Sequence, residues 1–231
     1  MKIVASRQRA GDGSIARLWF SAVLKCTNIA WPAICALCLA GCLSRPALVR
    51  AYFSFASQPP QGPSPTGQAQ ILGIRGLNVD APFDSQSFIY RTGPFSFERD
   101  PYAEFLVPPA RDLLAPVCAH FRRNGSFADV VKPDSALRPN ALVEITVTQL
   151  YGDFRNPGHA AAVLAMHCVF FKAAAADPGT VLLDREFTRS IPLKQSTASA
   201  VMAGWNEALQ QIVVSACADF HPKSEPVNKT Q

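Results

Sequence analysis

The sequence has few charged residues, and its small excess of positive charge is confined to the N-terminal end. Charged residues make up 17% of the 231 residues, and the formal net charge is +5. Residues 1–41 hold five basic residues and one acidic residue, which leaves a net charge of +1 for the rest of the chain. Proteins that bind nucleic acid rely on clustered Lys and Arg against phosphates. Nucleic acid is therefore excluded as an expected partner.

The N-terminal region lacks an apolar run long enough to cross a membrane. Residues 29–40, IAWPAICALCLA, carry no charge, but Lys25 precedes them and Arg45 follows them. Twelve helical residues span about 18 Å, whereas the hydrocarbon core of a bilayer is about 30 Å thick. A basic segment, a short apolar run and small residues at its end are typical of a secretory signal. A permanent membrane span is the weaker alternative.

The apolar run ends in Leu39-Ala40-Gly41-Cys42, which resembles a bacterial lipobox. In that motif the cysteine thiol takes a diacylglycerol, and the small residues before it let a signal peptidase reach the backbone. We therefore predict that residues 1–41 are a signal peptide, that cleavage occurs before Cys42, and that Cys42 is lipid-modified. The alternative is an unmodified cysteine in an ordinary signal that is cut nearby.

Few cysteines remain once that signal is removed. Cys26, Cys35 and Cys38 lie inside it, and Cys35-x-x-Cys38 has no second ligand pair to complete a zinc site. The other three are Cys118, Cys168 and Cys217, which lie in separate segments. Small buried hydrophobic residues are the favoured interpretation. One disulfide with one spare thiol stays open as the alternative, because the periplasm is oxidising.

The sequence also lacks the short motifs of common enzymes. It contains no Gly-x-Ser-x-Gly, no glycine-rich phosphate loop and no His-Glu-x-x-His. Its four histidines show no metal-ligand spacing. Asp184 and Glu186 share one face of a predicted strand and could form an acid–base pair, but neighbouring arginines favour an ordinary solvated face. We expect no enzymatic activity, no metal and no cofactor.

Composition divides the chain after Cys42 into three parts. Residues 56–69 are mostly Pro, Gly, Ser and Gln, which is typical of a linker. We predict a lipidated N-terminus and linker over 42–69, one folded domain over 70–222, and a polar tail over 223–231. The apolar stretch ALVRAYFSF, which ends at Phe55, is a candidate early strand lying against that domain.

Hydrophobic periodicity predicts an α+β fold. Runs of strands are interrupted by two main helices, which indicates a mixed or antiparallel sheet with both helices on one face. Strands are predicted at 71–79, 88–91, 95–98, 127–131, 143–147, 160–173 and 183–191, and the main helices at 109–123 and from 197 to 216.

The segment DPYAEFLVPPA, which starts at Asp100, holds the one candidate contact site. Asp100-Pro101 has the form of a helix N-cap followed by Pro at the first helical position, so a short helix is predicted here. Such a helix would bury only part of its apolar surface. Packing in the core and an exposed interface are the two alternatives. The residues concerned are Tyr102, Phe105, Leu106 and Val107.

Residues 88–121, FIYRTGPFSFERDPYAEFLVPPARDLLAPVCAHF, carry a resemblance to a known family. An apolar strand ending in Tyr-Arg, a small hairpin, an acidic and aromatic segment and a Pro-containing helix are similar to the ABC-type transport auxiliary lipoprotein family. That family includes the outer-membrane lipoprotein of the paraquat-inducible MCE lipid-transport system. The lipobox and the Trp-containing last helix fit as well, and the resemblance extends over about residues 70–220.

The resemblance implies a non-enzymatic periplasmic component of a lipid transporter. Its partners would be the periplasm-spanning MCE protein and the ABC transporter subunits of the inner membrane, and it would form a homo-oligomer. Leu43 and Ser44 follow Cys42 without the Asp that signals retention in the inner membrane. The expected location is therefore the outer membrane, facing the periplasm. An assembly factor or chaperone for outer-membrane machinery is the alternative function.

Overall fold

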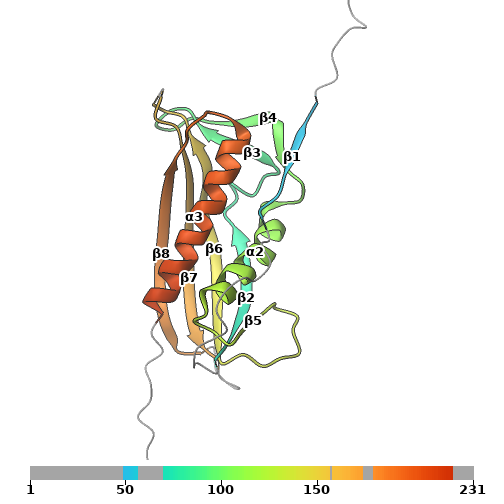
Figure 1. The fold of residues 1–231 in the computed structure, drawn as a ribbon, viewed down its shortest axis with the longest axis vertical. Coiled ribbons are helices and arrows are strands. Elements are labelled where there is room, and N and C mark those ends of the chain that lie inside the picture. The colour runs from blue at the N-terminus through green and yellow to red at the C-terminus, as the bar shows by residue number, and fades with distance from the viewer. Residues whose placement is uncertain (1–48, 57–69, 157, 174–178, 221–231) are drawn as a thin grey trace, which may run out of the picture. The chain divides into compact units, whose positions relative to one another are not determined.

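The computed structural model describes residues 49–56, 70–156, 158–173 and 179–220. In these residues one mixed sheet of eight strands carries two helices, which confirms the predicted α+β class (Figure 1). The strands are β1 Ala51–Phe53, β2 Ile71–Val79, β3 Ser87–Arg91, β4 Phe97–Phe105, β5 Asp129–Val131, β6 Ala141–Asp153, β7 Ala161–Lys172 and β8 Val181–Pro192. The helices are α2 Pro109–Asn124 and α3 Ala198–Asp219.

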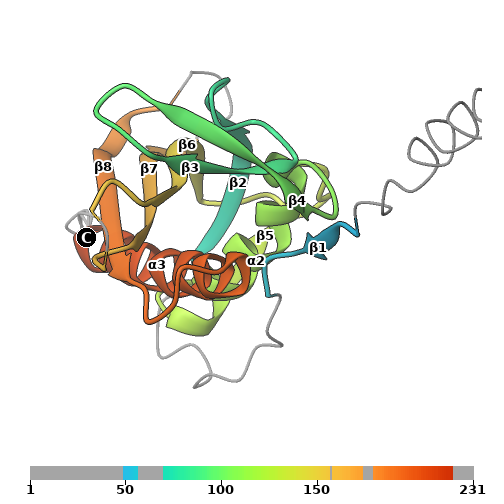
Figure 2. The same cartoon turned by 90° about the horizontal axis from the view of Figure 1, so that it is seen from above.

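The sheet is organised around β6. One edge of β6 pairs along its whole length with antiparallel β7, and β7 pairs in turn with β8. The other edge is shared, because the first half of β6 pairs with parallel β2 while its last residues pair with parallel β3. From β3 the sheet continues through β4 to β1 (Figure 2). The predicted central strand over 160–173 is thus confirmed as β7, which has a partner on each side.

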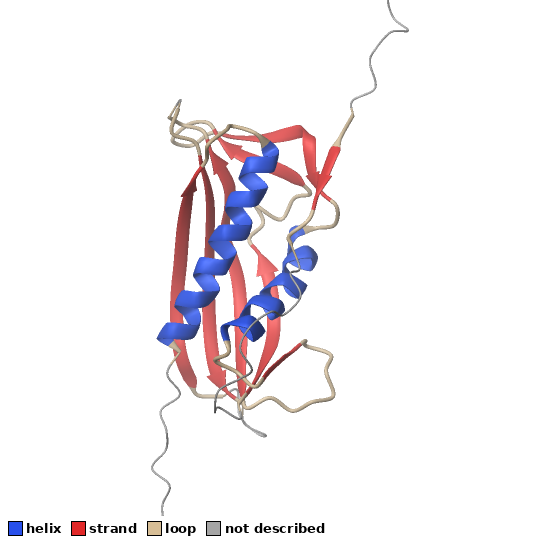
Figure 3. Ribbon diagram, viewed as in Figure 1, coloured by secondary structure: helices blue, strands red, loops and turns tan. Residues whose placement is uncertain are grey.

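Both helices pack on one face of the sheet, as predicted (Figure 3). Helix α3 begins at Thr197, whose hydroxyl oxygen accepts a hydrogen bond from the Ala200 N–H at 3.2 Å. Gly204 lets this helix approach β7 closely, since a Cβ there would lie 2.6 Å from that of Ala162. Helix α2 ends at Gly125, whose φ of 75° suits glycine.

The core between helices and sheet is rich in aromatic residues. The indole N–H of Trp205 donates to the carbonyl oxygens of Tyr151 and Val163 at 3.3 and 3.1 Å, which satisfies the one polar atom of a fully buried side chain. The largest fully buried aromatic side chains are Trp205, Phe88, Phe105, Phe121, Phe127 and Phe170.

The prediction of a helix starting at Asp100 is wrong, because Asp100 and Pro101 lie in β4. Ile89 pairs with Arg99 and Ser87 with Glu104, so residues 100–103 form a bulge. The Asp100 carboxylate caps this bulge by accepting from the N–H groups of Tyr102 and Ala103 at 2.7 and 3.1 Å. The same side chain chemistry that caps a helix therefore stabilises an irregular strand.

The folded domain includes residues upstream of the start expected at Gln70. The predicted early strand forms as β1, which pairs with β4 in parallel. Phe55 is 3% exposed and belongs to the core. The proline-rich stretch 57–69 thus connects two parts of the same domain and lies outside the described residues, as does the tail 223–231.

The three described cysteines are free and buried, which confirms the interpretation as small hydrophobic residues. Burial raises the pKa of Cys168 and of Cys217 to about 12. Because the thiolate is the reactive form, neither side chain is suited to nucleophilic chemistry at neutral pH.

Candidate interaction surface

The exposed apolar side chains around β1 and β4 form the candidate contact, which we call the β1–β4 patch. It consists of Tyr52, Tyr102, Leu106 and Val107, which are 59%, 54%, 62% and 39% exposed. Ala51 pairs with Ala103 and Tyr52 with Glu104. Because directly paired residues of neighbouring strands share a face of the sheet, Tyr52 and Glu104 lie on the same face, and Tyr102 is exposed on the bulge that precedes Glu104.

Phe105, the fourth residue predicted for this site, is buried beneath the patch. It is 1% exposed, and its ring centroid lies 4.7 Å from that of Phe88 and 5.6 Å from that of Trp205. Phe55 stacks on it from the β1 side at 5.9 Å. The structure thus separates the four residues, since Phe105 packs in the core while Tyr102, Leu106 and Val107 are exposed.

Polar contacts fix β1 against the rest of the domain. Arg50 pairs with Glu104 at 3.0 Å, and the Leu106 N–H donates to the Phe53 carbonyl oxygen at 2.8 Å. Beyond the strand, the Ser54 hydroxyl and the Phe55 N–H both donate to the carboxylate of Asp112 on α2, at 2.6 and 2.8 Å. The segment that carries Tyr52 is therefore bonded both to β4 and to α2.

The bulge that carries Tyr102 is held from β3. The Tyr90 hydroxyl donates to Asp100 at 2.7 Å, while the other carboxylate oxygen of Asp100 accepts from the Tyr102 N–H. Burial, with a further contribution from Asp100, raises the pKa of Tyr90 well above its usual value. The Tyr90 hydroxyl therefore stays protonated and donates to the Asp100 carboxylate, which in turn accepts from the Tyr102 N–H.

A second exposed feature is the hairpin tip between β3 and β4, residues 92–96. Its backbone closes through the N–H groups of Thr92 and Gly93, which donate to the Ser96 carbonyl oxygen. Phe95 lies in this turn and is 97% exposed. Sequence periodicity placed Phe95 in a strand, but β4 begins only at Phe97. The preceding Thr92-Gly93-Pro94 was the signal that could have placed this aromatic residue in a turn.

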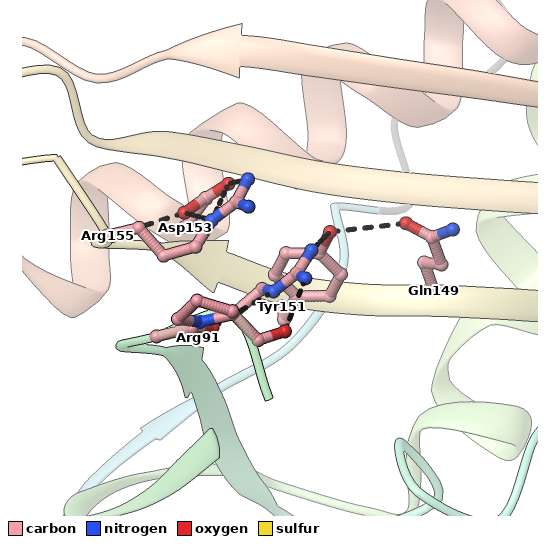
Figure 4. Close-up of polar contacts among 7 residues, drawn as sticks. Arg91, Gln149, Tyr151, Asp153 and Arg155 are labelled. Carbon is pink, nitrogen blue, oxygen red and sulfur yellow. Dashed lines mark hydrogen bonds and ion pairs between the residues drawn. The ribbon is translucent and has the colours of Figure 1, made fainter. Parts of the chain in front are cut away.

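Arg91, at the end of β3, is hydrogen-bonded to the backbone of this tip (Figure 4). Its guanidinium donates to the carbonyl oxygens of Pro94 at 2.8 Å and Gly93 at 3.3 Å, and to the Tyr151 hydroxyl at 3.5 Å. It also lies 5.7 Å from the ring centroid of Phe97 and 5.9 Å from that of Tyr151. Alongside it, Asp153 binds Arg155, which lowers the pKa of the Asp153 carboxyl. The backbone that precedes Phe95 is thus hydrogen-bonded to Arg91.

Asp184 and Glu186, the pair of acidic residues on one predicted strand face, each contact a different side chain. Asp184 lies 2.6 Å from His167, and Glu186 accepts from the Thr148 hydroxyl at 2.5 Å. Among the described residues no cluster of His, Cys, Asp and Glu could hold a metal ion, and no helix is long and apolar enough to cross a membrane. The lipobox residues Leu39, Ala40, Gly41 and Cys42 lie outside the described part of the chain.

The family model of the ABC-type transport auxiliary lipoprotein component matches residues 53–216. The chain belongs to this family. The match begins at Phe53, the last residue of β1, and ends within α3, so it covers β2 to β8, all of α2 and most of α3. None of the proteins of curated function matches the chain.

Two solved structures share the fold of this auxiliary lipoprotein domain. Protein XCC0632 from Xanthomonas campestris is 21% identical, with a TM-score of 0.57 over 72% of this chain and 92% of its own. The crystal structure of an uncharacterised protein is 11% identical, with a TM-score of 0.60 over 75% of this chain and 99% of its own. At these identities the likeness supports the fold alone.

Proposed function

We propose that this auxiliary lipoprotein is a non-enzymatic component of an MCE-type ABC transport system that moves lipid between membranes. The observation that carries the proposal is a family domain over residues 53–216 placed directly after a lipobox that ends at Cys42. In this account Cys42 carries the lipid, and the domain acts in the periplasm. ATP hydrolysis belongs to another subunit.

The β1–β4 patch is the proposed contact with a transporter subunit or with another copy of the chain. Exposed aromatic residues on a well-ordered support are the groups that most often dominate binding energy at protein interfaces. Tyr52 and Tyr102 meet this description, because Tyr52 lies in β1, which pairs with β4, and the Tyr102 N–H donates to the Asp100 carboxylate. Leu106 and Val107 extend the same apolar surface.

Co-isolation from mildly solubilised membranes tests the proposed function. We expect the tagged full chain to retain the permease, the ATPase and the MCE protein of one transport system. A control chain with the same tag and signal but an unrelated domain should retain none of them. Recovery of barrel-assembly or secretion components in their place would support the assembly-factor alternative and contradict the proposal.

Substitution of two patch residues tests the proposed interface. Tyr102→Ala combined with Leu106→Ala should leave the melting temperature nearly unchanged, because surface substitutions usually alter stability by less than about 0.5 kcal/mol. The same variant should lose most of its co-isolated partners or its oligomer. Val214→Ala is the matched control, since Val214 is 50% exposed on α3. Full partner recovery by the double variant would exclude the patch as the interface.

Membrane fractionation tests the location. Leu43 and Ser44 follow Cys42, so the mature protein should sediment with outer-membrane markers. Leu43→Asp introduces the residue that signals inner-membrane retention and should move the protein to the inner-membrane fraction. A wild-type protein found wholly with inner-membrane markers would contradict the proposed location.

A further inference from the structure

We infer that the end of the domain carrying the β3–β4 hairpin rests on the bilayer that holds the lipid anchor, with Phe95 inserted among the lipid head groups. The inference rests on the lipidation of Cys42, which is part of the proposed function. It adds a direct contact between the folded domain and a membrane surface.

The chain between the proposed anchor at Cys42 and the folded domain is short. Val49 is the first described residue and β1 starts at Ala51, so six residues, and seven steps from one Cα to the next, connect Cys42 to Val49. An extended chain spans at most about 3.6 Å per residue, which limits this connection to about 25 Å. The proline-rich stretch 57–69 adds nothing to the reach, because it follows β1. The start of β1 therefore stays close to the membrane.

The β3–β4 hairpin lies at the same end of the domain as β1. Figure 1 shows β1 with the β3–β4 pair at the upper end, while the connection from β5 to β6 lies at the lower end. The pairing agrees, because Arg91 at the end of β3 is opposite Asp153 at the carboxyl end of β6. Helix α3, whose 22 residues correspond to about 33 Å, runs from the upper end towards the lower one.

The tip of the hairpin is chemically suited to a membrane surface. Residues 92–97, Thr-Gly-Pro-Phe-Ser-Phe, carry no charge of their own, and the Arg91 guanidinium that contacts this turn is hydrogen-bonded to the carbonyl oxygens of Gly93 and Pro94. Contact with a bilayer would therefore bury no unpaired ionised group of the turn. Phe95 is 97% exposed, and Val49, two residues before the start of β1, is 85% exposed. Apolar side chains at a membrane interface gain from burial of their surface among the head groups.

The backbone of the hairpin tip has hydrogen-bond partners within the protein. Arg91 satisfies the carbonyl oxygens of Gly93 and Pro94, which are the groups that a bilayer would otherwise leave without a hydrogen-bond partner. The turn therefore keeps its shape without water at these two positions. A flexible loop would lose conformational entropy on insertion, and this braced turn avoids most of that loss.

Fluorescence quenching by brominated phospholipid tests the contact. The full chain with Phe95→Trp is expressed with its own signal, purified in lipidated form and reconstituted into phosphatidylethanolamine and phosphatidylglycerol vesicles containing phospholipid brominated near the head-group end of its chains. The background is low, because Trp205 is fully buried and Trp19 and Trp31 lie within the predicted signal. The matched control is Leu137→Trp, a site that is 54% exposed in the connection at the opposite end.

In these vesicles we expect the introduced tryptophan of the Phe95→Trp chain to lose most of its fluorescence intensity and to emit at shorter wavelength. The fluorescence intensity and emission wavelength of the Leu137→Trp chain should change little. Equal melting temperatures for both variants and the unsubstituted chain establish that the fold is retained. A lipidated Phe95→Trp chain that is quenched no more than the control would overturn the inference and leave the proposed function standing. So would a Phe95→Trp emission that responds only to an added transporter subunit, since the tip would then be a protein contact. Mass spectrometry showing no lipid on Cys42 would overturn the inference together with the proposed anchor.

Discussion

Phe105→Ala is expected to destabilise the domain by about 3–5 kcal/mol, the usual cost of truncating a buried Phe. Phe105 is 1% exposed and joins the rings of Phe55 on the β1 side to Phe88 and Trp205. Its loss would leave a cavity where β1, β3 and α3 meet. For a domain of this size each kcal/mol lowers the melting temperature by roughly 2–4 °C. Chemical denaturation and calorimetry of the full chain measure the effect.

Tyr102→Ala is the matched control for that substitution. Tyr102 lies three residues away on the same strand, but it is 54% exposed, so its truncation should leave the free energy of unfolding nearly unchanged. The two substitutions therefore separate core packing from interface contact within one segment. An unchanged melting temperature for Phe105→Ala, together with loss of partner binding, would show that Phe105 is an interface residue and does not stabilise the core.

Cys42→Ser is expected to abolish acyl labelling, leave the precursor uncut and remove the mature protein from the membrane fraction. In the lipobox reaction a cysteine thiol is the nucleophile that takes the diacylglycerol, and a hydroxyl does not replace it in this step. Each buried CH₂ contributes about 0.8 kcal/mol, and more than one acyl chain is needed for stable anchoring. Metabolic labelling and the mass of the isolated protein measure the outcome.

Cys118→Ala serves as the control for Cys42→Ser, because Cys118 is a buried cysteine of the folded domain. It should be labelled and processed as the unsubstituted chain is. If the Cys42→Ser chain were processed to the same mature mass as the unsubstituted chain, Cys42 would not be the lipidated residue.

Hydrophobic periodicity predicted the regular elements well, because their side-chain spacing reports directly which face is buried. The strand predicted from Ile71 to Val79 has those same bounds, and the last helix, predicted from 197, has Thr197 as its N-cap. Periodicity could not show that β6 divides one edge between β2 and β3, since each of those pairings joins distant segments. Fold class followed from sequence, while strand order required the structure.

The candidate surface was only partly predictable from the sequence. Asp100-Pro101 carries a capping signal, but a carboxylate that accepts backbone N–H groups suits a bulge as well as a helix start. The composition of the next residues did not distinguish Phe105 from Tyr102. Their opposite burial depends on strand alternation and on Phe55, which comes from beyond the proline-rich stretch. The exposed Phe95 was missed because the strand pattern was extended through a turn.

Site-specific photo-crosslinking from Tyr102 in living cells tests the central claim most directly. A photoreactive amino acid replaces Tyr102 in the full chain expressed with its own signal, and a second chain carries it at Val214 on α3 as the control. We expect the photoreactive residue at position 102 to crosslink to a subunit of one ABC-type transport system or to a second copy of the chain. This crosslink should be lost when the chain also carries Cys42→Ser. The photoreactive residue at position 214 should crosslink to neither. Capture of barrel-assembly or secretion components from Tyr102, or equal capture from both positions, would contradict the account.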